Sequence, residues 1–380
     1  MKKSVLLTSL AALGILAACE NTIRYEYDRN DAQITLHSQM STAESDHSIF
    51  LSMSYPDRTE SLTGASVVCY INDVRHDAVE QPVGTEEYYE YDPVNDDYVI
   101  KERVRNQRFT EYVFSAEIKP GDEVRVEASK GAQKAWAEVS VPQPARFVRV
   151  DTATVVRTLR YMDIDGGESW EDEFVDVTAT IRDASETDSY FTLTASRLME
   201  GEFRYYFPDG TLEKTEPYHS EEKSIWYETF HDRILEDGYS AGEVNDLLSE
   251  LLVTNETHCF SDKEFRGGEA TVRPSFESDR FYYSVRSRFG WIVPSGSVGE
   301  LHSVFRLHLQ TISRDFYNYL RAINNMKAYG YDVSPIIEPT MLPNNVVGGF
   351  GMVSVAAEDT YVFDFGWSVV DRSDGDDFYY

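Results

Sequence analysis

Cysteine is scarce in this sequence, with three residues among 380, at positions 19, 69 and 259. The first ends an N-terminal leader, so a framework of several disulfides is excluded. In the stretch SVVCYI, alternation predicts Cys69 as a small buried strand residue. Cys259 falls at a loop or strand edge, and whether the two thiols pair stays open. Long apolar runs are also missing after the leader, so no membrane-spanning helix is expected.

Positive charge is in short supply. The chain has 35 Lys and Arg against 66 Asp and Glu, a formal net charge of −31. Nucleic acids bind through Lys and Arg that displace counterions from phosphates, so a nucleic-acid partner is not expected. Anionic lipid headgroups should also repel so acidic a protein. The charge favours cationic ligands or basic protein surfaces, although only weakly.

Catalytic motifs are lacking as well. Neither HExxH nor GxSxG occurs, and the eight histidines are scattered. His302 and His308 share one strand face, but at ~3.3 Å per residue they lie about 20 Å apart, too far for one metal ion. We therefore expect no enzyme and no cofactor. A pair of carboxylates of the glycosidase type stays an open alternative, because such pairs form in space and not in sequence.

What the sequence has in abundance is strand-like alternation. From residue 32 to 143 the runs IFLSMSY, ASVVCYI, YVFSAEI, EVRVEAS and KAWAEVSV mix β-branched and aromatic residues with a period of two. Lys130-Gly131 separates the last two runs, which predicts a hairpin. We expect an immunoglobulin-like β-sandwich over 32–143. Two prolines in VPQPARF then mark a domain boundary.

Residues 144–380 are predicted to form a larger β-sandwich or barrel domain. Its strand-like runs include FVDVTATIRD, SYFTLTASRL and SVFRLHLQTI. Helical spacing predicts helices near 240–252 and 313–328, the second with Ser313 as N-cap and an apolar stripe of Phe316, Leu320 and Ile323. The expected fold class is therefore all-β and mainly antiparallel, with one or two packed helices.

One tyrosine-rich segment is a candidate ligand-binding surface. EEYYEYDPVNDDYV places Tyr88, Tyr89, Tyr91 and Tyr98 among acidic residues. Aromatic rings with carboxylates can stack on sugars or hold a cation. The alternative is a long hairpin whose tyrosines alternate between core and solvent.

Two other segments carry weaker signals. Asp163, Asp165 and Glu168 in DIDGGE are candidate Ca²⁺ ligands, but the EF-hand spacing is absent and a solvated loop is the alternative. NNVVGGFG has three glycines in four positions. Because they lead into a strand and not a helix, we interpret them as allowing positive φ or close packing, and not as a phosphate cradle.

The leader indicates how the protein is held. Lys2 and Lys3 precede an apolar run from Val5 to Ala18 that is too short to span a bilayer. Leu16-Ala17-Ala18-Cys19 resembles the lipobox of bacterial lipoproteins, which implies a signal peptide over 1–18, cleavage between Ala18 and Cys19, and acyl chains such as palmitate on Cys19. Two or more chains anchor stably to outer-membrane lipid. Residues 19–31 would form an acidic tether.

Several segments together resemble one family. TGASVVCYI, HCFSDKEFRGG, LQTISRDFYNYLRAINN and EPTMLPNNVVGGFGMVSV are similar to the Bacteroidetes lipoproteins catalogued as domain of unknown function 4249. The resemblance implies a lipid-anchored outer-membrane protein, facing the cell surface, that binds an unknown ligand without catalysis as an accessory to a TonB-dependent receptor. The alternatives are a structural or adhesion lipoprotein and a glycan or peptide hydrolase.

Overall fold

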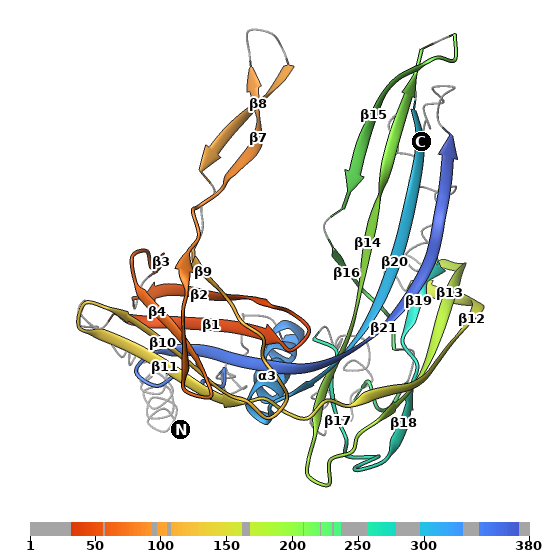
Figure 1. The fold of residues 1–380 in the computed structure, drawn as a ribbon. Coiled ribbons are helices and arrows are strands. Elements are labelled where there is room, and N and C mark those ends of the chain that lie inside the picture. The colour runs from red at the N-terminus through yellow and green to blue at the C-terminus, as the bar shows by residue number, and fades with distance from the viewer. Residues whose placement is uncertain are drawn as a thin grey trace, which may run out of the picture.

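A computed structural model describes residues 32–55, 58–92, 97–104, 108–161, 168–207, 209–220, 222–229, 232–236, 257–278, 297–329 and 342–371. These residues are mostly in antiparallel strands with a single helix (Figure 1), so the expected all-β class is confirmed. No helix in this part of the chain is both long and apolar enough to cross a membrane.

The N-terminal strands form two layers around one core. One layer has the order β1-β2-β9-β6, with β3 beside β2, and the other has the order β11-β10-β4-β5. The strands are β1 (Gln33–Ser41), β2 (Asp46–Ser54), β3 (Thr59–Ser61), β4 (Ser66–Ile71), β5 (Val74–Asp77), β6 (Val79–Glu80), β9 (Thr110–Ser115), β10 (Glu123–Lys130) and β11 (Gln133–Ser140). Alternation turns Val124, Val126 and Ala128 of β10 into the core. Lys130 pairs with Gln133 around Gly131, so the predicted hairpin is confirmed.

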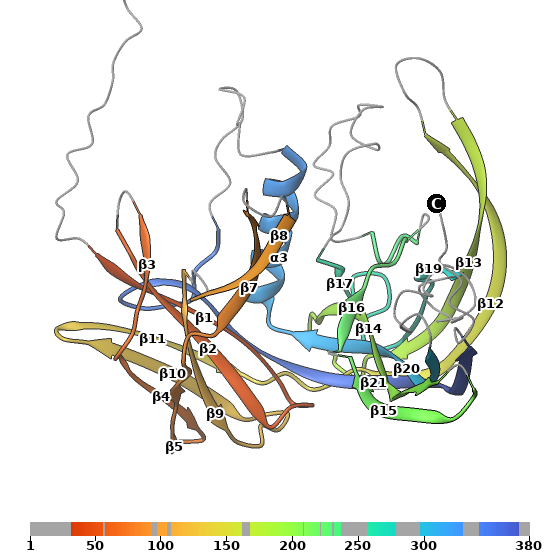
Figure 2. The same ribbon diagram turned by 90° about the horizontal axis from the view of Figure 1, so that it is seen from above.

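Longer strands form the C-terminal part. They are β12 (Arg146–Tyr161), β13 (Glu168–Arg182), β14 (Tyr190–Tyr206), β15 (Leu212–His219), β16 (Lys223–Ile225), β17 (Cys259–Ser261), β18 (Glu269–Val272), β19 (Ser275–Glu277), β20 (Ser297–Ile312) and β21 (Phe350–Asp371). Strands β14, β20 and β21 pack one face against β12, β13, β18 and β19 through a second core (Figure 2). Phe191, Phe276 and Phe305 are fully buried in it.

Strand β21 joins the two parts. Its first residues pair in parallel with β1, from Thr35↔Phe350 to Ser41↔Ala356, and its remainder pairs antiparallel with β20. Val353 and Val355 therefore belong to the N-terminal core. Within the described residues, one sheet of 11 strands thus runs through both parts of the molecule. The domain division after residue 143 stays a prediction. The first residues of β21, the last described strand, extend the sheet of the N-terminal sandwich beside β1.

The glycine-rich loop before β21 serves close packing, as the sequence predicts. At Gly351 φ is +124°, and an added Cβ would lie 2.0 Å from the carbonyl oxygen of Leu36. Asn345 fixes the loop: its amide oxygen accepts from Val353 N at 2.9 Å and its amide nitrogen donates to Val353 O at 2.7 Å. Gly349 and Gly351 therefore let the end of the loop and the start of β21 lie directly on β1, and Gly348 lies similarly close to Lys134 of β11.

The helix α3 (Arg314–Tyr329) confirms the second helix prediction. Ser313 Oγ accepts a hydrogen bond from Phe316 N at 3.2 Å, the contact of an N-cap. Phe316 and Tyr317 pack against Met352 of β21 and Cys259 of β17. The helix predicted near 240–252 lies outside the described residues.

Cys69 and Cys259 are both buried and are not joined to each other in a disulfide. Cys69 lies in the N-terminal core, as its alternation predicts, and burial raises the pKa of its thiol to about 12. Cys259 is the first residue of β17, next to the helix, which is the strand edge of the two positions that the sequence left open.

Candidate functional site

The tyrosine-rich segment forms a hairpin of its own. Strands β7 (Thr85–Asp92) and β8 (Asp97–Val104) make a separate two-stranded sheet that projects from the N-terminal sandwich (Figure 1). Its register pairs Tyr88 with Lys101, Tyr89 with Ile100 and Tyr91 with Tyr98. The backbone thus fits the hairpin expected as the alternative. A ligand at these tyrosines stays a prediction.

The other predicted site residues are not brought together by the described part of the chain. Ala18, Cys19, Asp163 and Asp165 lie outside it, and Glu168 starts β13. Among the described residues, no group of three or more His, Cys, Asp or Glu side chains could hold a metal ion.

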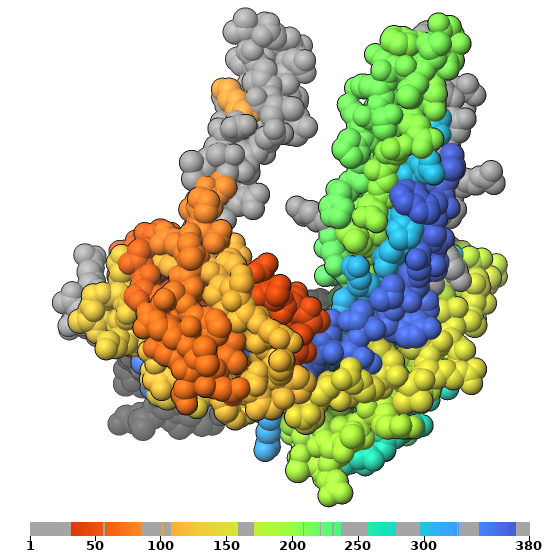
Figure 3. Space-filling view, viewed as in Figure 1, coloured from red at the N-terminus to blue at the C-terminus, as the bar shows by residue number. Residues whose placement is uncertain are grey.

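The long C-terminal sheet carries a polar surface that sequence reasoning did not single out. On β20 the odd-numbered Phe305, Leu307 and Leu309 face the second core, so the even-numbered residues face away from it. We call this opposite surface the polar face. It is formed by Thr192, Ser196, Glu200, Glu202 and Arg204 of β14, by Glu300, His302, Arg306, His308 and Gln310 of β20, and by Glu358, Thr360, Asp364 and Trp367 of β21. Figure 3 shows the three strands side by side along one arm of the molecule.

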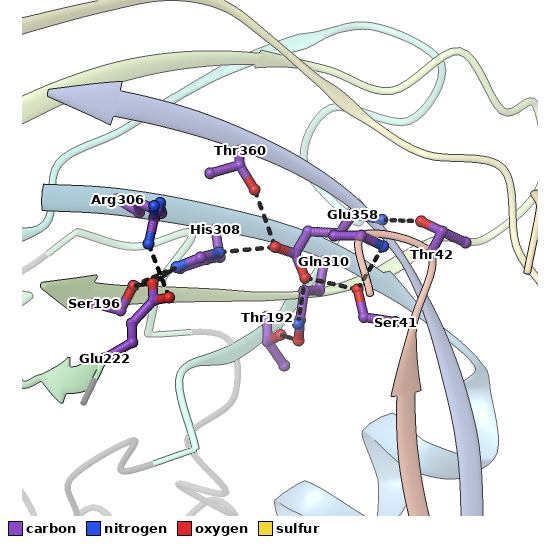
Figure 4. Close-up of polar contacts among 11 residues, drawn as sticks. Ser41, Thr42, Thr192, Ser196, Glu222, Arg306, His308, Gln310, Glu358 and Thr360 are labelled. Atoms are coloured by element: carbon purple, nitrogen blue, oxygen red, sulfur yellow. Dashed lines mark hydrogen bonds and ion pairs between the residues drawn. The ribbon is translucent and has the colours of Figure 1, made fainter. Parts of the chain in front are cut away.

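At the inner end of the polar face, Glu358 is the centre of a hydrogen-bond network (Figure 4). One carboxylate oxygen accepts from His308 Nδ1 at 2.7 Å and from Thr360 Oγ1 at 3.0 Å. The other accepts from Gln310 Nε2 and Ser41 Oγ, both at 2.8 Å. Because Ser41 ends β1, Glu358 connects the N-terminal sandwich to the C-terminal sheet.

Glu358 is an ionised carboxylate in a nearly buried position. Its side chain is 7% exposed. Burial alone would raise its pKa, but hydrogen bonds from His308, Gln310 and Ser41 lower that pKa to about 2.

Beside this carboxylate, Ser196, His308 and Glu358 have the order of a catalytic triad. Ser196 Oγ lies 2.6 Å from His308 Nε2, and the second ring nitrogen faces Glu358. However, Ser196 Oγ also contacts Glu222, which pairs with Arg306 at 2.8 Å. Burial would raise the pKa of Glu222, but hydrogen bonds from Ser196 and Arg306 lower it, so this carboxylate only accepts.

Proton counting distinguishes this network from a nucleophile and its base. Ser196 has one hydroxyl proton and donates it to Glu222, while His308 faces Ser196 Oγ with Nε2 and Glu358 with Nδ1. A general base must receive the serine proton, and here the carboxylate of Glu222 competes with His308 for that proton. Ser196 also lies between two paired strands, opposite Arg306 on β20 and Ser224 on β16. Backbone N–H groups used in this pairing do not point at an oxyanion, as a hydrolase would need.

At the end of the polar face far from the N-terminal sandwich, a β-bulge in β21 places the indole of Trp367 on this face. Tyr361, Phe363 and Phe365 of β21 pack against the second core, so regular alternation would send residue 367 there too. Between His302 and Val304 the register with β21 shifts, and Gly366 has φ +69°. This extra residue reverses the alternation, and Trp367 lies opposite His302 on the polar face.

Several contacts hold the bulge. Asp364 Oδ1 accepts from Gly366 N and contacts His302 Nε2, both at 2.8 Å. The Gly366 bond, with that of His302, holds the pKa of Asp364 below its ordinary value. The His302 ring stacks on the Trp367 indole, with centroids 5.3 Å apart and planes at 28°.

Trp367 borders an open cavity of about 470 Å³ on the polar face. This volume lies within the ~300–1,000 Å³ of small-molecule sites. The wall includes Glu200, Glu202, Arg204, Tyr218 and Glu300. At Gly201, an added Cβ would lie 2.0 Å from the Glu300 carbonyl oxygen, so β14 and β20 approach closely at this point.

Charged groups in the cavity are paired with each other. Arg204 contacts Glu202 at 2.5 Å and Glu300 at 2.6 Å. Glu200 lies 3.6 Å from His302 Nδ1. The wall therefore offers fixed donors and acceptors, with three carboxylates beside one guanidinium.

The sequence contained one usable signal for this cavity. Gly366 interrupts the strand pattern FDFGWSVV, and an isolated glycine in a strand often marks a bulge. Reversing the alternation after it would have placed Trp367 with His302. The pairing of β14 with β20, which completes the wall, has no local signal.

The fold and this face define a β protein with two cores and a polar cavity on its long C-terminal sheet. The family model described as Domain of unknown function (DUF4249) matches residues 20–361, and the chain belongs to this family. The family resemblance of the sequence is thereby confirmed. The matched segment ends before Trp367. A search of curated proteins finds no match.

Proposed function

We propose that the protein is a non-catalytic ligand-binding lipoprotein that serves an outer-membrane transporter of the TonB-dependent class. The observation that carries the binding role is the cavity beside Trp367, where a large exposed indole adjoins fixed polar groups. A concave site that combines an aromatic side chain with a few fixed polar groups is typical of a small-molecule binding site.

The proposed location rests on the leader. Acyl chains on Cys19 would hold the protein at the outer membrane, since each buried methylene contributes about 0.8 kcal/mol and two or more chains anchor stably. The net charge of −31 keeps the body away from anionic headgroups. The acidic tether over 19–31 supports a position facing the cell surface, where the ligand-binding face can meet extracellular molecules.

A hydrolase is the second candidate, because Ser196, His308 and Glu358 lie in triad order. The proton of Ser196 is directed to Glu222, which argues against this reading. A fluorophosphonate probe tests it directly: we expect no labelling of Ser196, whereas labelling that requires His308 would favour the hydrolase.

The transporter partnership is tested by isolating the native lipoprotein. The acylated protein is purified from envelopes of its own host in mild detergent, and its neighbours are identified by mass spectrometry. We expect a TonB-dependent receptor in the wild-type sample and its loss with Cys19→Ser, which should leave the envelope fraction. Recovery without a receptor would contradict the partnership, and retention of the serine variant would contradict the anchor. Protease shaving of intact cells, against a periplasmic control, tests the surface orientation.

A further inference from the structure

We infer that the cavity beside Trp367 binds a neutral sugar ring of an oligosaccharide, with the indole as the stacking platform. The inference rests on the proposed binding function and names the chemical class of its ligand. Three features of the described residues carry it: the exposed indole, the paired charges, and the shape of the cavity.

The indole is positioned and left uncovered. Trp367 is 60% exposed, although the odd-numbered Tyr361, Phe363 and Phe365 before the bulge pack against the second core on the opposite side of β21. Stacking on His302 supports the ring, and the bond from Gly366 to Asp364 fixes the bulge beneath it. A sugar ring presents C–H groups with partial positive charge, which pack favourably on the negative face of an indole.

The polar groups suit hydroxyls better than ions. Arg204 is shared between Glu202 and Glu300, so an incoming cation would compete with a guanidinium for the same carboxylates. An anion would meet Glu200, Glu202 and Glu300 beside one arginine. A hydroxyl both donates and accepts, so neighbouring hydroxyls of a sugar can bond to carboxylate and guanidinium without separating them.

The shape admits part of a chain. The cavity of about 470 Å³ is open along one side of the sheet, with Tyr218 of β15 in its wall and Trp367 at its border. One ring can lie on Trp367 while the next rings extend beyond the cavity. An oligosaccharide fits this geometry better than a compact ligand enclosed on all sides.

The test uses the full mature lipoprotein in detergent on an array of neutral, acidic and basic glycans. Titration calorimetry then measures the affinity for the best-bound neutral glycan. Trp367→Ala should weaken binding at least tenfold, and Trp367→Phe should retain part of it. Trp136→Ala, which removes an indole stacked on Arg125 in the N-terminal sandwich, is the matched control and should change the affinity less than twofold. Thermal unfolding identifies any variant that has lost its fold.

The outcomes separate the ligand class from the binding function. Neutral-glycan binding that depends on Trp367 supports the inference. No binding of neutral glycans overturns it, as does binding that Trp367→Ala and Trp367→Phe leave unchanged. Binding of spermine or a lysine-rich peptide instead, lost in Trp367→Ala, overturns the sugar class but leaves a binding module in place. A native complex without any receptor contradicts the proposed function independently of the array.

Discussion

Replacing Glu358 by glutamine removes an ionised carboxylate from the junction between the sandwich and the long sheet. The wild-type side chain accepts hydrogen bonds from His308, Gln310 and Ser41. Glutamine has nearly the same size, but its amide NH₂ replaces one carboxylate oxygen. That NH₂ group faces side chains that are themselves hydrogen-bond donors. Its amide also carries no charge to attract the imidazole.

The magnitude follows from the pKa of Glu358. Although burial opposes ionisation, the hydrogen bonds bring the pKa from 4.5 to about 2. At 1.36 kcal/mol per unit, ionised Glu358 stabilises the folded state by about 3 kcal/mol at neutral pH. Because the folded pKa is the lower one, this stabilisation is complete above about pH 5.5 and is lost as the pH falls from 4.5 toward 2, with about 1 kcal/mol remaining at pH 3.

The assay is urea unfolding of wild type and Glu358→Gln between pH 3 and pH 7. We expect the variant to be less stable by about 3 kcal/mol at pH 7, and the difference to shrink toward pH 3. Glu127→Gln is the matched control: Glu127 pairs with Arg125 at 39% exposure, so its loss should cost less than about 1 kcal/mol at any pH. A constant difference between wild type and Glu358→Gln across this range would refute the reasoning.

Three further outcomes are expected. Gly351→Ala should lower the free energy of unfolding by about 3 kcal/mol, since its Cβ would meet the Leu36 carbonyl oxygen; unchanged chemical denaturation would contradict this packing. The thiols of Cys69 and Cys259 should react with a disulfide reagent only after denaturation, and rapid reaction of the native protein would show that they are not buried. Ser196→Ala should leave glycan affinity unchanged within twofold by calorimetry, because Ser196 does not line the cavity; a larger loss would extend the site inward.

Local patterns predicted the fold where neighbours in sequence are neighbours in space. The β10–β11 hairpin, the burial of Cys69 and the helix after Ser313 each depend on a few consecutive residues. The glycine loop before β21 also followed local reasoning, because glycines leading into a strand do not form a phosphate cradle.

The polar face was missed because it depends on long-range pairing. Ser196, His308 and Glu358 come from three strands that alternation identifies singly but cannot order in a sheet. The parallel pairing of β21 with β1 likewise joins opposite ends of the chain. Trp367 was missed for a different reason: one inserted residue at Gly366 reverses the side on which every later residue of β21 lies.

The most direct test of the binding site is a crystal structure of the mature protein with its tightest-binding neutral glycan. The account predicts a sugar ring stacked on the Trp367 indole, with hydroxyls bonded to Glu202, Arg204 or Glu300. A glycan bound at the β7–β8 hairpin instead, with the cavity beside Trp367 free of sugar, would contradict it.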